Sequence, residues 1–328
     1  MYWQRYELGQ KDSAASGYTT DWYLKGITNL NLPTTSVEAI AASGTLAYHT
    51  WRDHDQLLQQ HGREEEGVWV RVKGGKLSRS DQFEFENKYT QYELGYDQKL
   101  KSTPAYTRYA GISFSYLDGD SSYSSGSGEN KVKALNIYGT QIGAKGHYLD
   151  LVVKYSQLNN DFKVFDTSGN KITGDYEQNG LLISAEYGRK NNLKNNWYIE
   201  PQAQLTFGRL RGTDYTTSNG IRVGQDGIDS FVGRVGFNIG KDINEKTNIY
   251  LKANLMHEFS GGYNASMVDA SGTKARLDRD FDDTWFEYGL GAAVQTGKNN
   301  YFYVDVERSA GSDYKKDWQW NVGGRWTF

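Results

Sequence analysis

Residues 317–328 read DWQWNVGGRWTF and alternate between two kinds of side chain. One face carries Gln319, Asn321 and Arg325 among smaller residues. Because successive side chains of a strand point to opposite faces, this period of two predicts a β-strand between a polar and an apolar environment. The apolar face consists of Trp318, Trp320, Val322, Gly324, Trp326 and Phe328.

The same alternation recurs upstream from about Gly67 to the C-terminus. For example, Ile249, Leu251 and Leu255 alternate with Lys252 and Asn254. Counting such segments predicts about twelve strands. Their approximate centres are Val70, Glu93, Ser113, Asn136, Val152, Ser184, Ala203, Val235, Leu251, Leu290, Val304 and Val322.

The connections between these segments are alternately long and short. We expect long loops over residues 118–129, 158–174, 211–225 and 260–282, and short turns over 143–146, 189–196, 241–247 and 297–300. Outer-membrane barrels have short periplasmic turns and longer outer loops, whereas a soluble β-sandwich has no reason to keep this order. The sequence therefore predicts an all-β fold, a 12-stranded antiparallel up-and-down transmembrane β-barrel with its apolar face toward lipid.

Aromatic residues gather near the predicted strand ends, as interfacial girdles require. They include Trp197, Tyr198, Trp285, Tyr301, Trp318 and Trp326. A barrel also explains why 328 residues with 14% aromatics have a mean hydropathy of −0.74, because every second strand residue faces the lumen.

The composition excludes several classes of protein. No run of about 18 apolar residues exists, so the sequence predicts no transmembrane helix. The absence of Cys excludes a disulfide scaffold and a thiolate zinc site. A net charge of −3 gives no support to a nucleic-acid partner. Residues 1–10 lack the apolar core of a signal peptide, so we expect any export signal to lie outside this sequence.

Residues 34–60 form the one convincing helical stretch. Its apolar residues recur at helical spacing, and they are Val37, Ile40, Ala41, Gly44, Tyr48 and Trp51. Twelve strands enclose a lumen too wide for side chains alone to fill. At about 1.5 Å per residue the helix would span roughly 39 Å, so we predict one N-terminal α-helix in the pore.

Phrases in the right order along the chain resemble the translocator (β) domain of monomeric autotransporters of type Va secretion. They are SVEAIAASGTLAYHTWRDHDQLLQQ (36–60), GVWVRVKGG (67–75), YTQYELGYDQ (89–98), YLDGDSSYSSGSG (116–128), GHYLDLVVKY (146–155), WYIEPQAQLTFGRLRG (197–212), VGRVGFNIGKD (232–242) and DWQWNVGGRWTF. The resemblance covers roughly residues 32–328.

The resemblance implies an outer-membrane translocator of a Gram-negative bacterium, with its N-terminal side at the cell surface. Residues 1–31 would be the end of a passenger and its junction, 32–66 a linker with the pore-spanning helix, and 67–328 the barrel. The implied partners are outer-membrane lipid, the barrel assembly machinery, periplasmic chaperones and the chain's own passenger domain. We expect a monomer with no cofactor and no metal.

Three groups of residues are candidates for function. Helix residues Tyr48, Trp51, Arg52 and Asp53 are expected to face the lumen and to hold the helix there. Trp326 and Phe328 resemble the C-terminal signal read by the assembly machinery, and an edge strand offers it backbone hydrogen bonds. The lumen network that would contact the helix comprises Arg71, Glu93, Glu186, Glu200, Arg234, Glu287 and Arg325.

Three alternatives stay open. Some members of the family cleave their own passenger with an Asn in the helix and an acidic lumen residue. Residues 32–75 contain no Asn, and Asn29 and Asn31 lie before the helix, so we name no catalytic residue. A barrel hydrolase would need a surface His with an acid, and His257 beside Glu258 is the one candidate pair. A porin-like channel would lack a plugging helix before its first strand.

Overall fold

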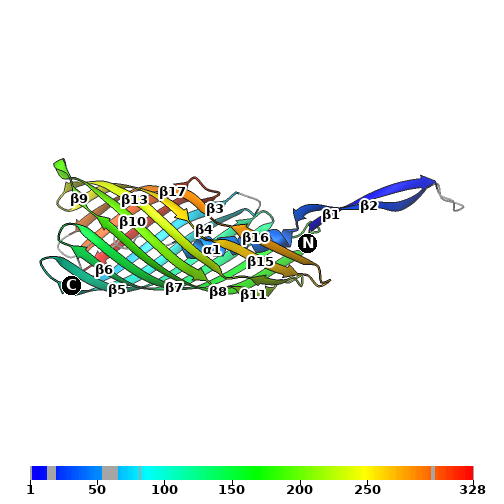
Figure 1. Cartoon of the computed structure of the whole chain (residues 1–328), viewed down its shortest axis with the longest axis horizontal. Coiled ribbons are helices and arrows are strands. Elements are labelled where there is room, and N and C mark those ends of the chain that lie inside the picture. Colours follow the sequence, from blue (N-terminus) through cyan, green and yellow to red (C-terminus); the bar gives the residue numbers. More distant parts are fainter. Residues whose placement is uncertain (1, 13–19, 54–65, 81–82, 297–299, 328) are drawn as a thin grey trace.

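A computed structural model of the chain describes residues 2–12, 20–53, 66–80, 83–296 and 300–327, and within them twelve long strands wind into a closed barrel (Figure 1). The barrel strands are β3 (Gly67–Arg79), β4 (Phe85–Ser102), β5 (Tyr106–Tyr123), β6 (Gly126–Gly143), β7 (His147–Phe165), β8 (Lys171–Arg189), β10 (Trp197–Leu210), β13 (Ile228–Asn244), β14 (Thr247–Glu258), β17 (Asp283–Thr296), β18 (Asn300–Ala310) and β19 (Tyr314–Trp326).

Every neighbouring pair in the barrel is antiparallel, and the first strand pairs with the last. Val72 of β3 lies opposite Val322 of β19, which closes the sheet. Each of the twelve predicted strand centres falls within one of these strands, so the predicted number and order of strands are confirmed.

The barrel wall is apolar outside and polar inside, as the alternation predicts. On β14, Leu251 is 57% exposed whereas its neighbour Lys252 is 6% exposed. A polar lumen face and an apolar outer face suit a wall that stands in lipid. Within the described residues, no helix combines the length and the apolar character needed to cross a membrane.

Two aromatic residues do not join the predicted girdle. Trp285 and Tyr198 are buried on the lumen side, whereas Trp197, Trp318 and Trp326 are exposed on the outer face. Trp285 stacks with the guanidinium of Arg52, 4.4 Å from its ring centroid. The inward position of each residue in its strand, rather than its closeness to a strand end, decides where the ring lies.

At one end of the barrel, strands continue through regions in which the sequence predicts long loops. β5 and β6 pair from Tyr123 and Gly126 onward, so residues 118–129 form a hairpin instead of a loop. The prediction failed because both faces of a strand beyond the membrane tolerate polar residues, which removes the apolar signal. Residues 158–174 are likewise mostly strand. The regions 211–225 and 260–282 contain β11 (Thr213–Thr216), β12 (Arg222–Gln225), β15 (Gly262–Val268) and β16 (Lys274–Asp280), which form a separate four-stranded sheet.

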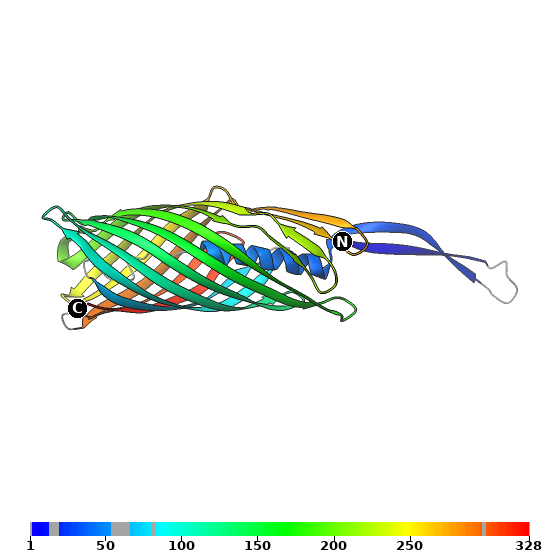
Figure 2. The same cartoon turned by 90° about the horizontal axis from the view of Figure 1, so that it is seen from below.

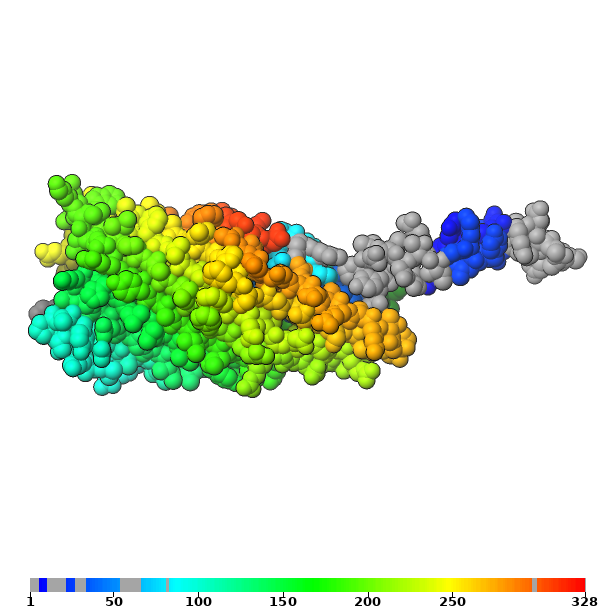
Figure 3. Space-filling view, in the orientation of Figure 1, coloured from blue at the N-terminus to red at the C-terminus, as the bar shows by residue number. Residues whose placement is uncertain are grey.

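The opposite end of the barrel carries short turns, β9 (Asn191–Asn192) and the 3₁₀ turn η1 (Lys194–Asn196). The C-terminus lies at this end (Figure 1). β1 (Tyr2–Asp12) and β2 (Thr20–Pro33) pair as a hairpin that leaves the barrel at the other end. Figure 3 shows the segment containing β15 and β16, in orange, projecting at that same end.

Helix α1 (Thr35–Arg52) lies inside the barrel, in the half nearer the β1–β2 hairpin (Figure 2). Asp53 already has an extended backbone, with ψ at 105°, so the prediction that the helix continues to Gln60 is wrong at its first step. Residues 54–60 themselves, and the expected stop at Gly62, lie outside the described residues. The helix has 18 residues and is therefore about 27 Å long. From Ala39 onward every helix residue is buried, because barrel side chains surround all its faces.

Candidate functional site

The first half of α1 is held by the four-stranded sheet and by the wall beneath it. The hydroxyl of Tyr263 on β15 donates to the carbonyl of Ile40 at 3.2 Å. Its ring lies directly over Gly44, where a side chain of any size would collide with it. Ser43 and Tyr176 of β8 share a hydrogen bond of 2.8 Å. The four-stranded sheet and β8 therefore enclose the first half of the helix.

The C-terminal half of the helix is anchored on Glu258, the fully buried last residue of β14. The Tyr48 hydroxyl donates to its carboxylate at 2.5 Å, and the Ser230 hydroxyl donates at 2.6 Å. The backbone N–H of Phe231 donates at 2.7 Å. The guanidinium of Arg52 lies 3.6 Å from the same carboxylate, so Glu258 contacts two side chains of the helix.

Trp51 fixes the rotation of the helix against the nearby strands β8 and β10. Its indole lies over Gly180 of β8 and Gly208 of β10. A Cβ at Gly208 would stand 2.7 Å from the indole ring, and a Cβ at Gly180 would overlap the indole nitrogen. The two glycines therefore form a recess in which the largest helix side chain fits.

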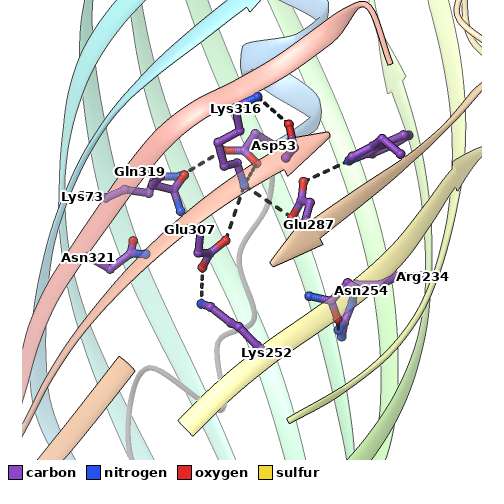
Figure 4. Close-up of polar contacts among 12 residues, drawn as sticks. Asp53, Lys73, Arg234, Lys252, Asn254, Glu287, Glu307, Lys316, Gln319 and Asn321 are labelled. Carbon is purple, nitrogen blue, oxygen red and sulfur yellow. Dashed lines mark hydrogen bonds and ion pairs between the residues drawn. The ribbon is translucent and has the colours of Figure 1, made fainter. Parts of the chain in front are cut away.

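Asp53 ends the helix with two ion pairs to neighbouring strands. Its two carboxylate oxygens lie 3.3 Å from Lys73 of β3 and 3.3 Å from Lys316 of β19. Figure 4 shows both ammonium groups directed at this residue. These pairs explain the early end of the helix, because Asp53 leaves the helical path to lie between the two lysines.

The charges continue from Lys316 across the lumen (Figure 4). Lys316 lies 3.5 Å from Glu287 of β17 and 3.7 Å from Glu307 of β18. Glu307 pairs with Lys252 of β14, which also reaches Asp305 at 3.1 Å. In a narrow lumen such charges interact more strongly than on an open surface. The helix end is thus part of a charge network that connects β3, β14, β17, β18 and β19.

Six of the seven residues predicted as the lumen network are buried, and Glu287 is half-buried. Glu287 is tied to the helix through Lys316. Arg71 pairs with Glu93, and Arg325 pairs with Asp97. Glu200 accepts a hydrogen bond from Gln202 at 2.9 Å, and Arg234 lies 2.9 Å from Glu186.

Arg71, Arg234 and Arg325 pair with acids on other strands of the wall. The helix anchors, in contrast, are residues that the sequence did not single out for this role. The missed residues are Lys73, Glu258, Tyr263 and Lys316. The alternation placed Lys73 on the same face as Arg71, which is the one signal that pointed to it.

Of the two residues of the predicted assembly signal, the structure describes Trp326. Trp326 is 39% exposed on the outer face, where its ring meets Phe302 edge-on at 5.6 Å. Phe328 lies outside the described residues.

The candidate His–Glu pair of a hydrolase is not assembled. His257 bonds Thr284 at 2.7 Å and faces outward, whereas Glu258 points into the lumen. Asn29 and Asn31, the residues weighed for passenger cleavage, lie in β2 and not in the helix. Within the described ranges, no three His, Asp or Glu side chains are placed to share a metal ion.

Residues 68–307 match the family model described as "Autotransporter beta-domain". The chain is 32% identical to the pertactin autotransporter of Bordetella parapertussis over 74% of this chain and 26% of that protein. It is 29% identical to the probable autotransporter YcgV of Escherichia coli, over 80% of this chain and 27% of that protein. The chain spans about a quarter of the length of these curated relatives.

Solved structures show the same architecture. The β domain of the Bordetella autotransporter BrkA superposes with a TM-score of 0.65 at 25% identity, over 81% of this chain and all (100%) of that one. The translocator domain of NalP from Neisseria meningitidis gives a TM-score of 0.67 at 13% identity, over 90% of this chain and 100% of that one. The NalP likeness concerns the fold alone.

Proposed function

The chain belongs to the autotransporter β-domain family, and from this premise we propose that it exports a passenger joined to its N-terminal side and anchors it at the cell surface. The domain is an outer-membrane translocator of type V secretion rather than an enzyme. The family match also favours the translocator over the porin-like and hydrolase alternatives. Residues 1–31 would then be the end of the passenger and its junction with the barrel.

The orientation follows from the two ends of the barrel. Outer-membrane barrels keep short turns in the periplasm and longer segments outside. The short turns lie with the C-terminus, and the β1–β2 hairpin leaves at the opposite end among the extended strands (Figure 2). The N-terminal side therefore faces the cell surface in our proposal.

The observation that carries the proposal is the position of α1 inside the barrel. When a passenger leaves through the lumen, the segment that joins it to the barrel remains inside the lumen. α1 is the helix that precedes β3, the first strand of the barrel. The helix would be retained by Tyr263, by Glu258, by the recess at Gly180 and by the ion pairs of Asp53 with Lys73 and Lys316. The retained helix then closes the outer half of the lumen and connects the passenger to the membrane.

We assign the remaining candidates to folding and insertion. The buried pairs Arg71–Glu93 and Glu186–Arg234 would hold the lumen wall in shape below the helix. Trp326 and Phe328 would be read by the barrel assembly machinery, after periplasmic chaperones have carried the unfolded chain. The chain would act as a monomer, because one barrel already encloses its own helix.

The experiment that tests export uses a reporter that stays unfolded until it has crossed the membrane, fused ahead of Met1 behind a signal peptide in intact cells. We expect added protease to degrade the reporter while a periplasmic marker survives. A matched fusion that lacks β19 should leave the reporter protected. A reporter that resists protease in cells whose barrel is folded in the outer membrane would contradict the proposal.

A further inference from the structure

A groove of about 500 Å³ crosses the outer wall of the barrel over β13, β14, β17 and β18. The wall recedes there because the small side chain of Ala292 stands between Ile249 and Val304 in the strand register, and the backbones of Gly240 and Gly291 lie beside it. The rest of its lining comprises the aliphatic residues Ile239, Leu251, Leu290 and Val306, together with Tyr250 and Asp305. The Tyr250 hydroxyl donates to the Asp305 carboxylate, which is buried on the lumen side of the wall.

One end of this groove is cationic and aromatic. Lys241 and Trp197 lie opposite each other in the β10–β13 register, and both line the groove. The Lys241 ammonium is 5.6 Å from the centroid of the Trp197 ring. In the described part of the chain Lys241 has no carboxylate partner, so its charge is available to an external anion.

The groove also has a direction relative to the membrane. Lys241 lies toward the short turns, three strand residues before β13 ends at Asn244, whereas Leu251 and Leu290 lie deeper in the apolar band. Exposed Trp and Lys side chains belong at the level of lipid headgroups. The apolar part therefore runs into the hydrocarbon region from a headgroup position.

We propose that this groove binds one anionic phospholipid of the leaflet nearer the short turns, with an acyl chain over Ala292 and its phosphate against Lys241. The volume lies within the range of small-molecule sites, about 300–1,000 Å³. Charge complementarity at one end distinguishes the site from the surrounding wall. The bound lipid would fill a depression in the wall into which the acyl chains of the surrounding bilayer fit poorly.

The test is native mass spectrometry of the full chain, purified in detergent and supplied with phosphatidylglycerol or phosphatidylethanolamine. We expect one phosphatidylglycerol to remain bound under activation that strips other lipids. Ala292→Phe, which fills the groove on the outer face, should lose that lipid. Lys241→Gln should lose the preference for phosphatidylglycerol over phosphatidylethanolamine.

Two control variants keep the result specific. Ala253→Phe also enlarges an outward alanine of β14 but lies outside the groove, and Lys246→Gln removes a cation from the same end. Both should retain the lipid as the unaltered chain does. Equal retention by Ala292→Phe would overturn the proposal, and so would an unchanged preference in Lys241→Gln. A dimer that Ala292→Phe dissociates would assign the groove to a second copy instead.

Discussion

The carboxylate of Asp53 lies 3.3 Å from the ammonium of Lys316 and connects the end of α1 to β19, the last strand of the barrel. Its second oxygen lies equally close to Lys73 of β3, the first strand. β3 and β19 pair with each other and close the barrel. The residue that directly follows the helix therefore bridges the strands on both sides of the closing seam.

Replacing Asp53 by Asn should loosen the helix end, because two lysines lose their shared carboxylate. Hydrogen bonds to charged groups contribute about 1.5–3 kcal/mol, and each 1.4 kcal/mol corresponds to about tenfold in an opening equilibrium. Hydrogen exchange of the amides in the last turn of α1 should accelerate about tenfold or more. Asp317→Asn, which alters the neighbouring pair with Lys76, should leave that exchange unchanged.

Replacing Glu258 by Gln should destabilise the folded barrel. The carboxylate accepts from Tyr48 and Ser230 and faces Arg52, so an amide leaves a buried cation uncompensated. Loss of one partner of a buried ion pair costs about 3 kcal/mol or more. The temperature at which the barrel loses its compact mobility on a detergent gel should fall. Glu129→Gln, at an exposed pair, serves as the control, and equal behaviour of the two variants would refute the anchor role.

Alanine at Gly180 should displace Trp51 from its recess, because the new methyl group overlaps the indole. Overpacking of this kind typically costs about 1–3 kcal/mol. The Trp51→Ala change should suppress the defect, so that the double variant is less damaged than the sum of the two single variants. Gly139→Ala meets only a backbone oxygen at 3.8 Å and should leave stability unchanged. Additive losses in the double variant would argue against the recess.

Trp326→Ala should reduce the amount of folded barrel in the outer membrane of cells, while refolding of the purified chain into lipid vesicles stays normal. A ring that only anchors the strand in the interface would affect both measurements. Trp318 lies on the same strand and face, with similar exposure, and Trp318→Ala is the matched control. Equal loss in both variants would remove the recognition role from Trp326.

The strands were predictable because lipid and lumen impose opposite demands on alternate residues. Leu251 and Lys252 already show this contrast in the sequence, and all twelve centres fall in barrel strands. The hairpin ends were not predictable, since residues such as Asp118 and Glu129 lie in strands where both faces are polar. There the alternation no longer carries information about structure.

The partners of the helix depend on contacts across the lumen that no local pattern encodes. The helical pattern continues past Arg52, yet Asp53 leaves the helix because Lys73 and Lys316 meet it from distant strands. The sequence suggests Glu258 only as an acid beside His257, whereas the side chains of the two residues face opposite sides of β14. The helix residues Tyr48, Trp51, Arg52 and Asp53 could be named from the sequence as candidates, and their role stays a prediction, whereas the wall residues that they contact depend on the three-dimensional register.

The central claim is that α1 closes the barrel lumen, and conductance in planar lipid bilayers tests it most directly. The intact chain should show small and infrequent currents, and removal of residues 2–53 should produce large steady ones. Asp53→Asn should fall between them, with more frequent openings than the intact chain. Large steady currents in the intact chain that persist unchanged after the deletion would contradict the account.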